Sequence, residues 1–186
     1  QALGDAEDRV SHLSDSPSGD LRVAAPMSFA VRALAPLLPA FHRLYPELRL
    51  SLDLNDRMID IVAAGVDLAL RIGPLVDSSL VARRIAEFAR VCCAAPAYLN
   101  RRGRPRTPAD LSRHACLHYN NLGLREEWTL TGEDGDIAVD VAGPLCANNG
   151  DLLRRAALAG MGICSLPTFI VAEDLAAGRL ERVLAD

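Results

Sequence analysis

The feature of this sequence that most constrains its fold is the regular exchange of short apolar runs with segments of helical periodicity. Residues 21–25 form an apolar run, residues 34–45 place leucines and a phenylalanine at helical spacing, and residues 48–54 alternate leucines with polar residues. A helix over residues 55–65 and a third strand over residues 67–72 are expected next. Such alternation predicts βαβ units, with a largely parallel sheet that carries helices on its faces.

The second half of the chain repeats this alternation with more strands. Helices are expected to open at Thr107, Asn149 and Thr168, and residues 132–135 favour a hairpin turn. Strands are expected over residues 80–85, 88–95, 115–119, 127–131, 136–141, 144–147, 163–166 and 180–184. We place the division between two α/β units near residues 94–96.

The first 20 residues have a different pattern. Apolar residues in the first 14 positions follow a 3, 4, 3 spacing, which is the seam of two heptads, and residues 14–20 are typical of a linker. Two heptads fit either the end of a coiled-coil helix or a frayed amphipathic tail. Because the chain shows no signal sequence and no apolar run of about 18 residues, we expect a cytoplasmic protein that does not cross a membrane. A secreted chain whose signal peptide was removed is the alternative.

Composition and motifs narrow the class of function. Twenty basic residues, all of them arginine, stand against 24 acidic ones, and the net charge of −4 disfavours DNA binding by this chain alone. The five cysteines contain no CxxC pair, so a disulfide framework is not expected. The motifs of nucleophile elbows, zinc proteases and phosphate-binding or dinucleotide-binding loops are absent. We therefore expect neither an enzyme nor a cofactor.

Two loops are candidates for binding a small anion. In a parallel sheet, ligands collect at the carboxyl ends of strands, where helix N-termini present amide donors. Met27, Ser28 and Phe29 are expected in the loop after the first strand, and Asn148 and Asn149 lead into a helix of the second unit. The alternative for Ser28 is a helix-capping role.

Arg71 is the one charged residue in the otherwise apolar run of residues 68–72, within the strand expected at residues 67–72. A guanidinium at a strand end is a natural partner for an anion, and an ion pair with Asp67 or Asp53 is the alternative. Further candidates for the facing wall of the site are His118, Tyr119, Pro167 and Thr168.

Histidines and cysteines alternate at His114, Cys116 and His118, which on a strand would share one face. No fourth metal ligand is apparent nearby, so a capping histidine and a buried thiol are favoured and no metal is expected. Cys92 and Cys93 are adjacent in an apolar strand and would point to opposite faces. We interpret them as core residues rather than a redox pair.

A basic run stands out near the middle of the chain, with Arg101, Arg102, Arg104 and Arg106. It has no interleaved aromatic residues, which favours a solvated loop. Contact with phosphate is the alternative.

Four longer stretches are GDLRVAAPMSFAVRALAPLLPAFHRLYPELRLSL, VDLALRIGPLVDSSLVARRI, CCAAPAYLNRRGRPRTPADLSRHACLHY and LRRAALAGMGICSLPTFIVAEDLAAGRLERVL. In this order they resemble the effector-binding regulatory domain of LysR-type transcriptional regulators, over about residues 19–184. The resemblance implies a type 2 periplasmic-binding-protein-like α/β fold. That fold has two lobes with mixed, largely parallel sheets and a small-molecule cleft between them.

The resemblance also implies a domain organisation. Residues 1–20 would be the tail of a linker helix and the linker, residues 21–94 regulatory lobe I, and residues 95–186 regulatory lobe II. The strand and helix that return to lobe I in the family are not found in this sequence. The DNA-binding helix-turn-helix, which lies N-terminal to the linker helix in the family, does not precede Gln1.

The function implied is sensing of a small, anionic metabolite in the cleft. Occupancy would change the angle between the lobes and so the arrangement of DNA-binding domains in a homo-oligomer, a dimer or a tetramer. The apolar helices expected at residues 34–45 and 152–159 are candidates for the subunit interface. The alternatives are a trimmed periplasmic solute-binding protein of the same fold class and a small cleft enzyme.

Overall fold

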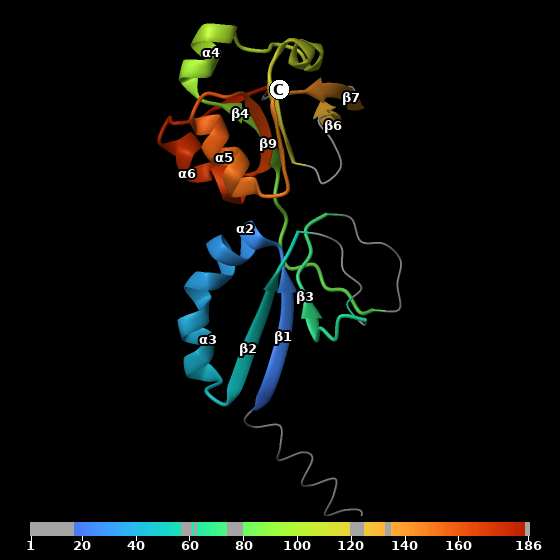
Figure 1. Cartoon of the computed structure of the whole chain (residues 1–186), viewed down its shortest axis with the longest axis vertical. Coiled ribbons are helices and arrows are strands. Elements are labelled where there is room, and N and C mark those ends of the chain that lie inside the picture. The colour runs from blue at the N-terminus through green and yellow to red at the C-terminus, as the bar shows by residue number, and fades with distance from the viewer. Residues whose placement is uncertain are drawn as a thin grey trace, which may run out of the picture. The chain divides into compact units, whose positions relative to one another are not determined.

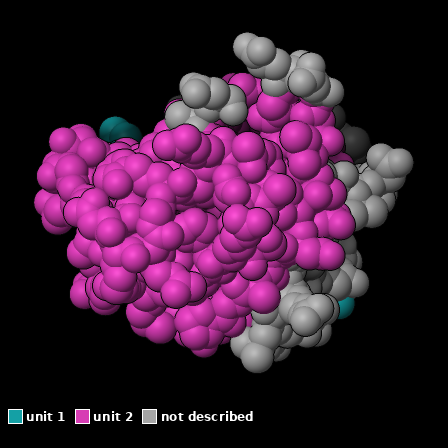
Figure 2. All heavy atoms as spheres, turned by 90° about the horizontal axis from the view of Figure 1, so that it is seen from above, with its two compact units in different colours: residues 1–79 teal, residues 80–186 magenta. Residues whose placement is uncertain are grey.

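The chain forms two compact units, residues 1–79 and residues 80–186, which Figure 2 colours separately. The computed structural model describes residues 17–56, 61, 63–73, 80–119, 125–132 and 135–184. The predicted heptads at the N-terminus lie outside this part of the chain, as do residues 57–60 and 62 of the helix predicted over residues 55–65. The described residues of that predicted helix are not helical; most of them form turns. No helix within the described ranges is long and apolar enough to span a membrane.

The first unit contains a three-stranded parallel sheet in the order β2-β1-β3. Its strands are β1 (Gly19–Ala25), β2 (Leu48–Leu54) and β3 (Leu68–Ala69). In β2 the leucines are half-buried while the residues between them are exposed, which confirms the predicted alternation. The third strand is shorter than predicted. Because the strands are parallel, their carboxyl ends meet at one edge of the sheet.

A long helical segment follows β1 (Figure 1). It runs through α2 (Met27–Phe29), η1 (Ala30–Leu34), η2 (Ala35–Leu37) and α3 (Leu38–Leu44). The prediction that the helix begins near residue 34 was wrong, because helical backbone starts directly after Pro26. Pro36 and Pro39 lack an amide donor, and the chain adapts with a π-helical turn and a 3₁₀ turn rather than ending the helix.

The second unit is built on a five-stranded mixed sheet in the order β10-β4-β9-β5-β8. Its strands are β4 (Arg90–Ala94), β5 (Cys116–Tyr119), β8 (Leu145–Ala147), β9 (Ile163–Pro167) and β10 (Glu181–Val183). β4 is antiparallel to both of its neighbours, whereas β9, β5 and β8 are parallel to one another. The helices of this unit that connect its strands include α5 (Gly150–Leu158) and α6 (Thr168–Ala176) (Figure 1).

A hairpin completes the second unit. Its strands, β6 (Arg125–Gly132) and β7 (Gly135–Ala142), pair in antiparallel register with Gly132 opposite Gly135, which confirms the predicted turn. Trp128 and Val141 from the two strands are buried in the unit's core.

Two predictions between residues 80 and 113 were wrong or incomplete. The strand predicted over residues 80–85 is absent from this described stretch, where the apolar side chains are exposed and pair with no sheet. The helix α4 (Pro96–Arg102) was not predicted, although proline opens it and Gly103, with φ +86°, ends it. The helix predicted at Thr107 is confirmed as a 3₁₀ helix, η3 (Pro108–Arg113), with a capping box between Thr107 and Asp110.

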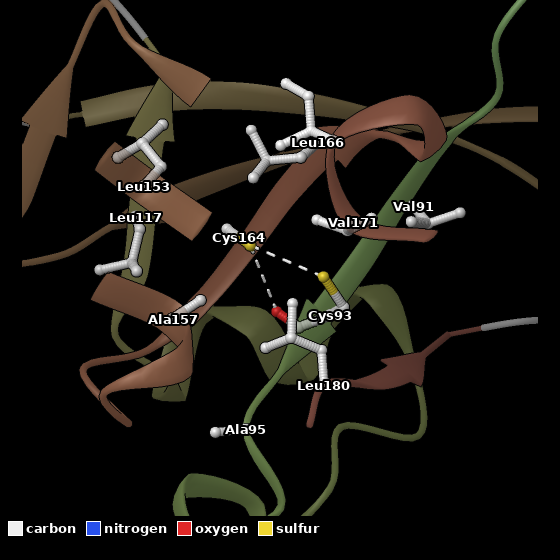
Figure 3. Packing of buried hydrophobic residues seen from close by; sticks show 11 residues of the cluster. Val91, Cys93, Ala95, Leu117, Leu153, Ala157, Cys164, Leu166, Val171 and Leu180 are labelled. Carbon is white, nitrogen blue, oxygen red and sulfur yellow. Dashed lines mark hydrogen bonds between the residues drawn. The ribbon is translucent and has the colours of Figure 1, made fainter. Parts of the chain in front are cut away.

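Two clusters of buried residues fill the second unit, one on each face of its sheet. Figure 3 shows the first, in which Leu117, Leu153 and Leu166 surround Cys93 and Cys164. Cys92 belongs to the second cluster, together with Leu99 and Leu111. Adjacent residues of a strand point to opposite faces. The assignment of Cys92 and Cys93 to opposite sides of the core is therefore confirmed.

Candidate functional site

Ser28 is the most informative polar residue of the first unit. It lies in the first helical turn after β1, is only 4% exposed, and its Oγ has no hydrogen-bond partner among the described residues. The N-cap residue is Pro26 and no side chain caps the helix, so Ser28 does not take the capping role considered as its alternative. A buried hydroxyl without a partner costs free energy unless a ligand or water satisfies it. Ser28 is therefore a binding candidate in its own right.

The amide groups beside Ser28 are partly occupied. The Met27 amide donates to Asp56 Oδ1 at 3.0 Å, so a carboxylate of the protein already takes one donor predicted for an external anion. Met27 and Phe29 belong to the helix itself, which corrects the prediction that they form a loop. An anion that approaches Ser28 therefore also meets the charge of Asp56 and requires a compensating cation.

Arg71 supplies a guanidinium at the same edge of the first sheet. The Leu70 amide donates to the Ala24 carbonyl at 2.8 Å, which extends the pairing of β3 with β1 by one residue. Arg71, the next residue, therefore lies at the end of the sheet where β1 leads into the helix that carries Ser28. Arg71 is half-buried. Asp67 accepts a hydrogen bond from the Arg22 amide at 2.8 Å through Oδ2.

The parallel strands of the second unit bring the other candidates to one edge of their sheet. Tyr119 pairs with Ala147 in the β5–β8 register, so Tyr119 and the exposed Asn148 lie at the same end. Pro167 and Thr168 follow at the carboxyl end of β9, which runs parallel to β5.

Two of these residues also hold the local structure together. Asn149 is the N-cap of α5, and its Oδ1 accepts from the Leu152 amide at 2.9 Å, as predicted. The Thr168 amide donates to the Ala89 carbonyl at 2.9 Å at the start of α6.

The histidines of the second unit are placed differently from one another. His118 is completely buried in β5. His114 lies before that strand, where its Nδ1 is 3.1 Å from the hydroxyl of Tyr98. Cys116 is a buried thiol that donates to the Leu111 carbonyl. In the described ranges no three histidine, cysteine or acidic residues are grouped as a metal site.

Arg90 is a site candidate that the sequence analysis missed. It opens β4, which runs antiparallel to β9, and it pairs with Pro167 at the edge that carries the other candidates. Its Nη2 donates to the Ser165 carbonyl at 2.7 Å, and the residue is exposed. The signal was available, because Arg90, like Arg71, is a single charge at the end of an apolar strand.

Two α/β units, each with polar residues at the carboxyl edge of its sheet, define the class of type 2 periplasmic-binding-protein-like domains that bind small molecules. Residues 14–186 match the family model described as the LysR substrate binding domain. The chain belongs to this family, the regulatory domain of LysR-type transcriptional regulators.

Individual relatives agree with this assignment. The chain is 35% identical over 190 residues to the HTH-type transcriptional regulator DmlR of Escherichia coli (strain K12), covering 100% of this chain and 61% of that protein. It is 34% identical over 186 residues to CrgA of Neisseria meningitidis serogroup C (strain 8013), covering 100% and 62%. The chain thus spans about three fifths of the length of these relatives. Their names are those of regulators, which supports the regulator over the predicted alternatives, a solute-binding protein or an enzyme.

Solved structures show the same fold. The regulatory domain of CrgA from Neisseria meningitidis superimposes with a TM-score of 0.79 at 35% identity, covering 91% of this chain and 82% of that chain. Full-length AphB from Vibrio cholerae gives a TM-score of 0.83 at 30% identity, covering 99% and 62%. The predicted fold class is confirmed.

Proposed function

We propose that this chain senses a small, anionic metabolite through residues at the carboxyl edges of its two sheets. The observation that carries the proposal is the buried Ser28 hydroxyl, which lacks a partner among the described residues and lies at the edge where Arg71 follows β3. The proposed effector residues are Met27, Ser28, Phe29, Arg71, His118, Tyr119, Asn148, Asn149, Pro167 and Thr168, and Arg90 is added to them.

The chemistry favours a carboxylate or a similar anion. A hydroxyl donor and a guanidinium each form charge-assisted hydrogen bonds with such a group, worth about 1.5–3 kcal/mol apiece where water is excluded. Asp56 holds the neighbouring Met27 amide, so its negative charge repels an anion that binds without a cation. Arg71 is the guanidinium that would offset this repulsion.

The whole protein would then act as a transcriptional regulator. We propose that effector occupancy changes the arrangement of the two units and, in a cytoplasmic homo-oligomer, of DNA-binding helix-turn-helix domains N-terminal to this chain. A dimer or a tetramer would form through the apolar helices around residues 34–45 and 152–159. Leu37 and Leu44 on the first, and Leu152 on the second, are large exposed apolar side chains that suit such an interface.

The test is a comparison of two arginine variants. A set of small mono- and dicarboxylates is screened by thermal shift, and the strongest binder is titrated calorimetrically into the wild-type chain. Arg71→Ala should weaken binding about ten- to a hundredfold, with the unfolding temperature of the free chain little changed. The matched control is Arg49→Ala, which removes an exposed arginine paired with Asp20 near the amino ends of β1 and β2.

The control should bind the carboxylate like the wild type. Undiminished affinity in Arg71→Ala would show that Arg71 is no part of the site. A loss of stability in Arg71→Ala without a selective loss of affinity would instead support the structural ion pair considered as its alternative.

A further inference from the structure

A polar hollow lies in the second unit, formed by residues of α4, η3 and the segment that joins them. Its volume is about 280 Å³, and four arginines line it together with Asp110 and His114: Arg102, Arg104, Arg106 and Arg113. Three of these arginines belong to the basic run that the sequence analysis singled out. None of the proposed effector residues lines this hollow.

The acidic groups near the hollow are already engaged. Glu181 holds Arg104 through two bonds, from Nε at 2.6 Å and from Nη2 at 2.8 Å. Asp110 Oδ2 accepts from the amides of Arg106 and Thr107 and from the Thr107 hydroxyl. The carboxylate of Asp110 is thus committed to the capping box of η3, which holds it in place.

The remaining guanidiniums are not committed in this way. The side chains of Arg106 and Arg113 form no hydrogen bond or ion pair with another described residue. Among the described residues, the Arg102 side chain makes one hydrogen bond, a long one of 3.5 Å to the carbonyl of Arg113. Three guanidiniums therefore face a single carboxylate, and the hollow carries a surplus of positive charge.

His114 adds an imidazole ring to the lining of the hollow. The Tyr98 hydroxyl oxygen accepts from the Ala115 amide at 2.9 Å, and it also lies 3.1 Å from His114 Nδ1. Burial, followed by the nearby charge of Arg102, lowers the pKa of His114 below its usual value. Near pH 7 the ring is then largely neutral.

We propose that this hollow binds a compact, multiply charged phosphate group, such as the diphosphate of a small metabolite, at a site separate from the proposed effector site. Guanidiniums suit phosphoryl oxygens because their planar donors form paired hydrogen bonds with them. The residues 102–114 curve around one concave space, which fits a small anion. A duplex would instead require a basic stripe that follows successive phosphates along its backbone.

The test titrates the 186-residue chain with inorganic pyrophosphate. Arg106→Gln and Arg113→Gln should each weaken binding roughly tenfold or more, and the double variant should abolish measurable binding. Arg155→Gln is the matched control, because Arg155 is an exposed arginine of α5 outside the hollow. Ser28→Ala should also bind pyrophosphate like the wild type, which separates this proposal from the effector site.

Unfolding temperatures of all variants are measured alongside, and both replaced arginines are exposed, so folded variants are expected. Equal affinity of pyrophosphate for the wild type and the double variant would overturn the proposal. Tighter binding of a short DNA duplex than of pyrophosphate, lost in the same double variant, would assign the hollow to DNA and overturn it as well.

Discussion

Arg154 of α5 and Asp174 of α6 form an ion pair in which the carboxylate is completely buried and the arginine side chain is 16% exposed. Arg179 Nε donates to the other oxygen of Asp174 at 2.7 Å. The carboxylate therefore links α5 and α6 to the turn that carries Arg179. Removing one partner of a buried pair leaves the other charge uncompensated. Asp174→Asn should lower the free energy of unfolding by about 3–5 kcal/mol, measured by urea denaturation. A loss below about 1 kcal/mol would contradict this account.

The same carboxylate should make stability sensitive to acid. Burial raises the pKa of Asp174, but the hydrogen bonds from Arg154 and Arg179 outweigh it and hold the pKa below its usual value. The stabilisation is present above the pKa of the unfolded chain, near 4, and is lost as pH falls through the lower folded-state pKa. Unfolding free energies measured from pH 6 down to pH 3 should fall more steeply for the wild type than for Asp174→Asn. Parallel curves would be inconsistent with the ion pair.

The buried thiols should resist alkylation in the folded chain. Burial raises the pKa of Cys92 to about 11 and of Cys116 to about 12. The hydrogen bond with Cys93 and burial together raise the pKa of Cys164, whose sulfur lies 3.6 Å from that of Cys93. Since the thiolate is the reacting form, iodoacetamide at pH 8 should label the half-buried Cys146 first.

Mass spectrometry of labelled peptides checks this prediction, and the same reaction in urea, where all five cysteines should react, is its control. Rapid labelling of Cys93 or Cys164 under native conditions would show that the core in Figure 3 opens readily.

Two substitutions of Asn149 distinguish its structural role as a helix cap from its proposed role in binding. Asn149→Ala removes the cap of α5 and should cost about 1 kcal/mol of stability. Asn149→Asp keeps an oxygen acceptor for the Leu152 amide but adds a negative charge, so stability should be retained while the affinity for a carboxylate falls. Calorimetric titration and urea denaturation of both variants check this. Full carboxylate affinity in Asn149→Asp would remove Asn149 from the proposed site.

The proposed interface predicts self-association of the chain. At high micromolar concentration the wild type should sediment above its 20.0 kDa monomer mass, and Leu37→Asp with Leu44→Asp should give the monomer. Val81→Asp is the control, since Val81 is fully exposed and lies on neither helix. A wild type that sediments as a monomer, or a double variant that still associates, would argue against this interface.

The sequence predicted the elements whose local signals and packing agree. Asn149 as a helix cap, the hairpin turn at Gly132–Gly135 and the leucine alternation of β2 were all correct, because each depends on neighbouring residues alone. The prediction of a strand at residues 80–85 was wrong, because an apolar run does not show whether a partner strand exists beside it. The start of the first helix was placed too late, because prolines are usually found in the first turn of a helix and Pro36 was taken to mark that turn.

The site residues were harder to predict, because they depend on strand order. Arg90 reaches the same edge as Tyr119 and Asn148 only because β4 runs antiparallel to β9, and no spacing in the sequence reveals that direction. That Asp56 occupies the Met27 amide also depends on a contact across 29 positions. The importance of Ser28 depends in the same way on its burial, which no local signal reveals.

Ser28→Ala is the sharpest test of whether the buried hydroxyl of the first unit binds the effector. The Ser28 Oγ has no partner among the described residues, so its removal should leave the unfolding temperature of the free chain unchanged or slightly raised. The affinity for the strongest carboxylate found in the screen should fall about ten- to a hundredfold in calorimetric titration. Ser112→Ala, which removes an exposed serine hydroxyl, should bind the carboxylate like the wild type. Unchanged affinity in Ser28→Ala, or a loss of stability in place of a loss of affinity, would contradict the account.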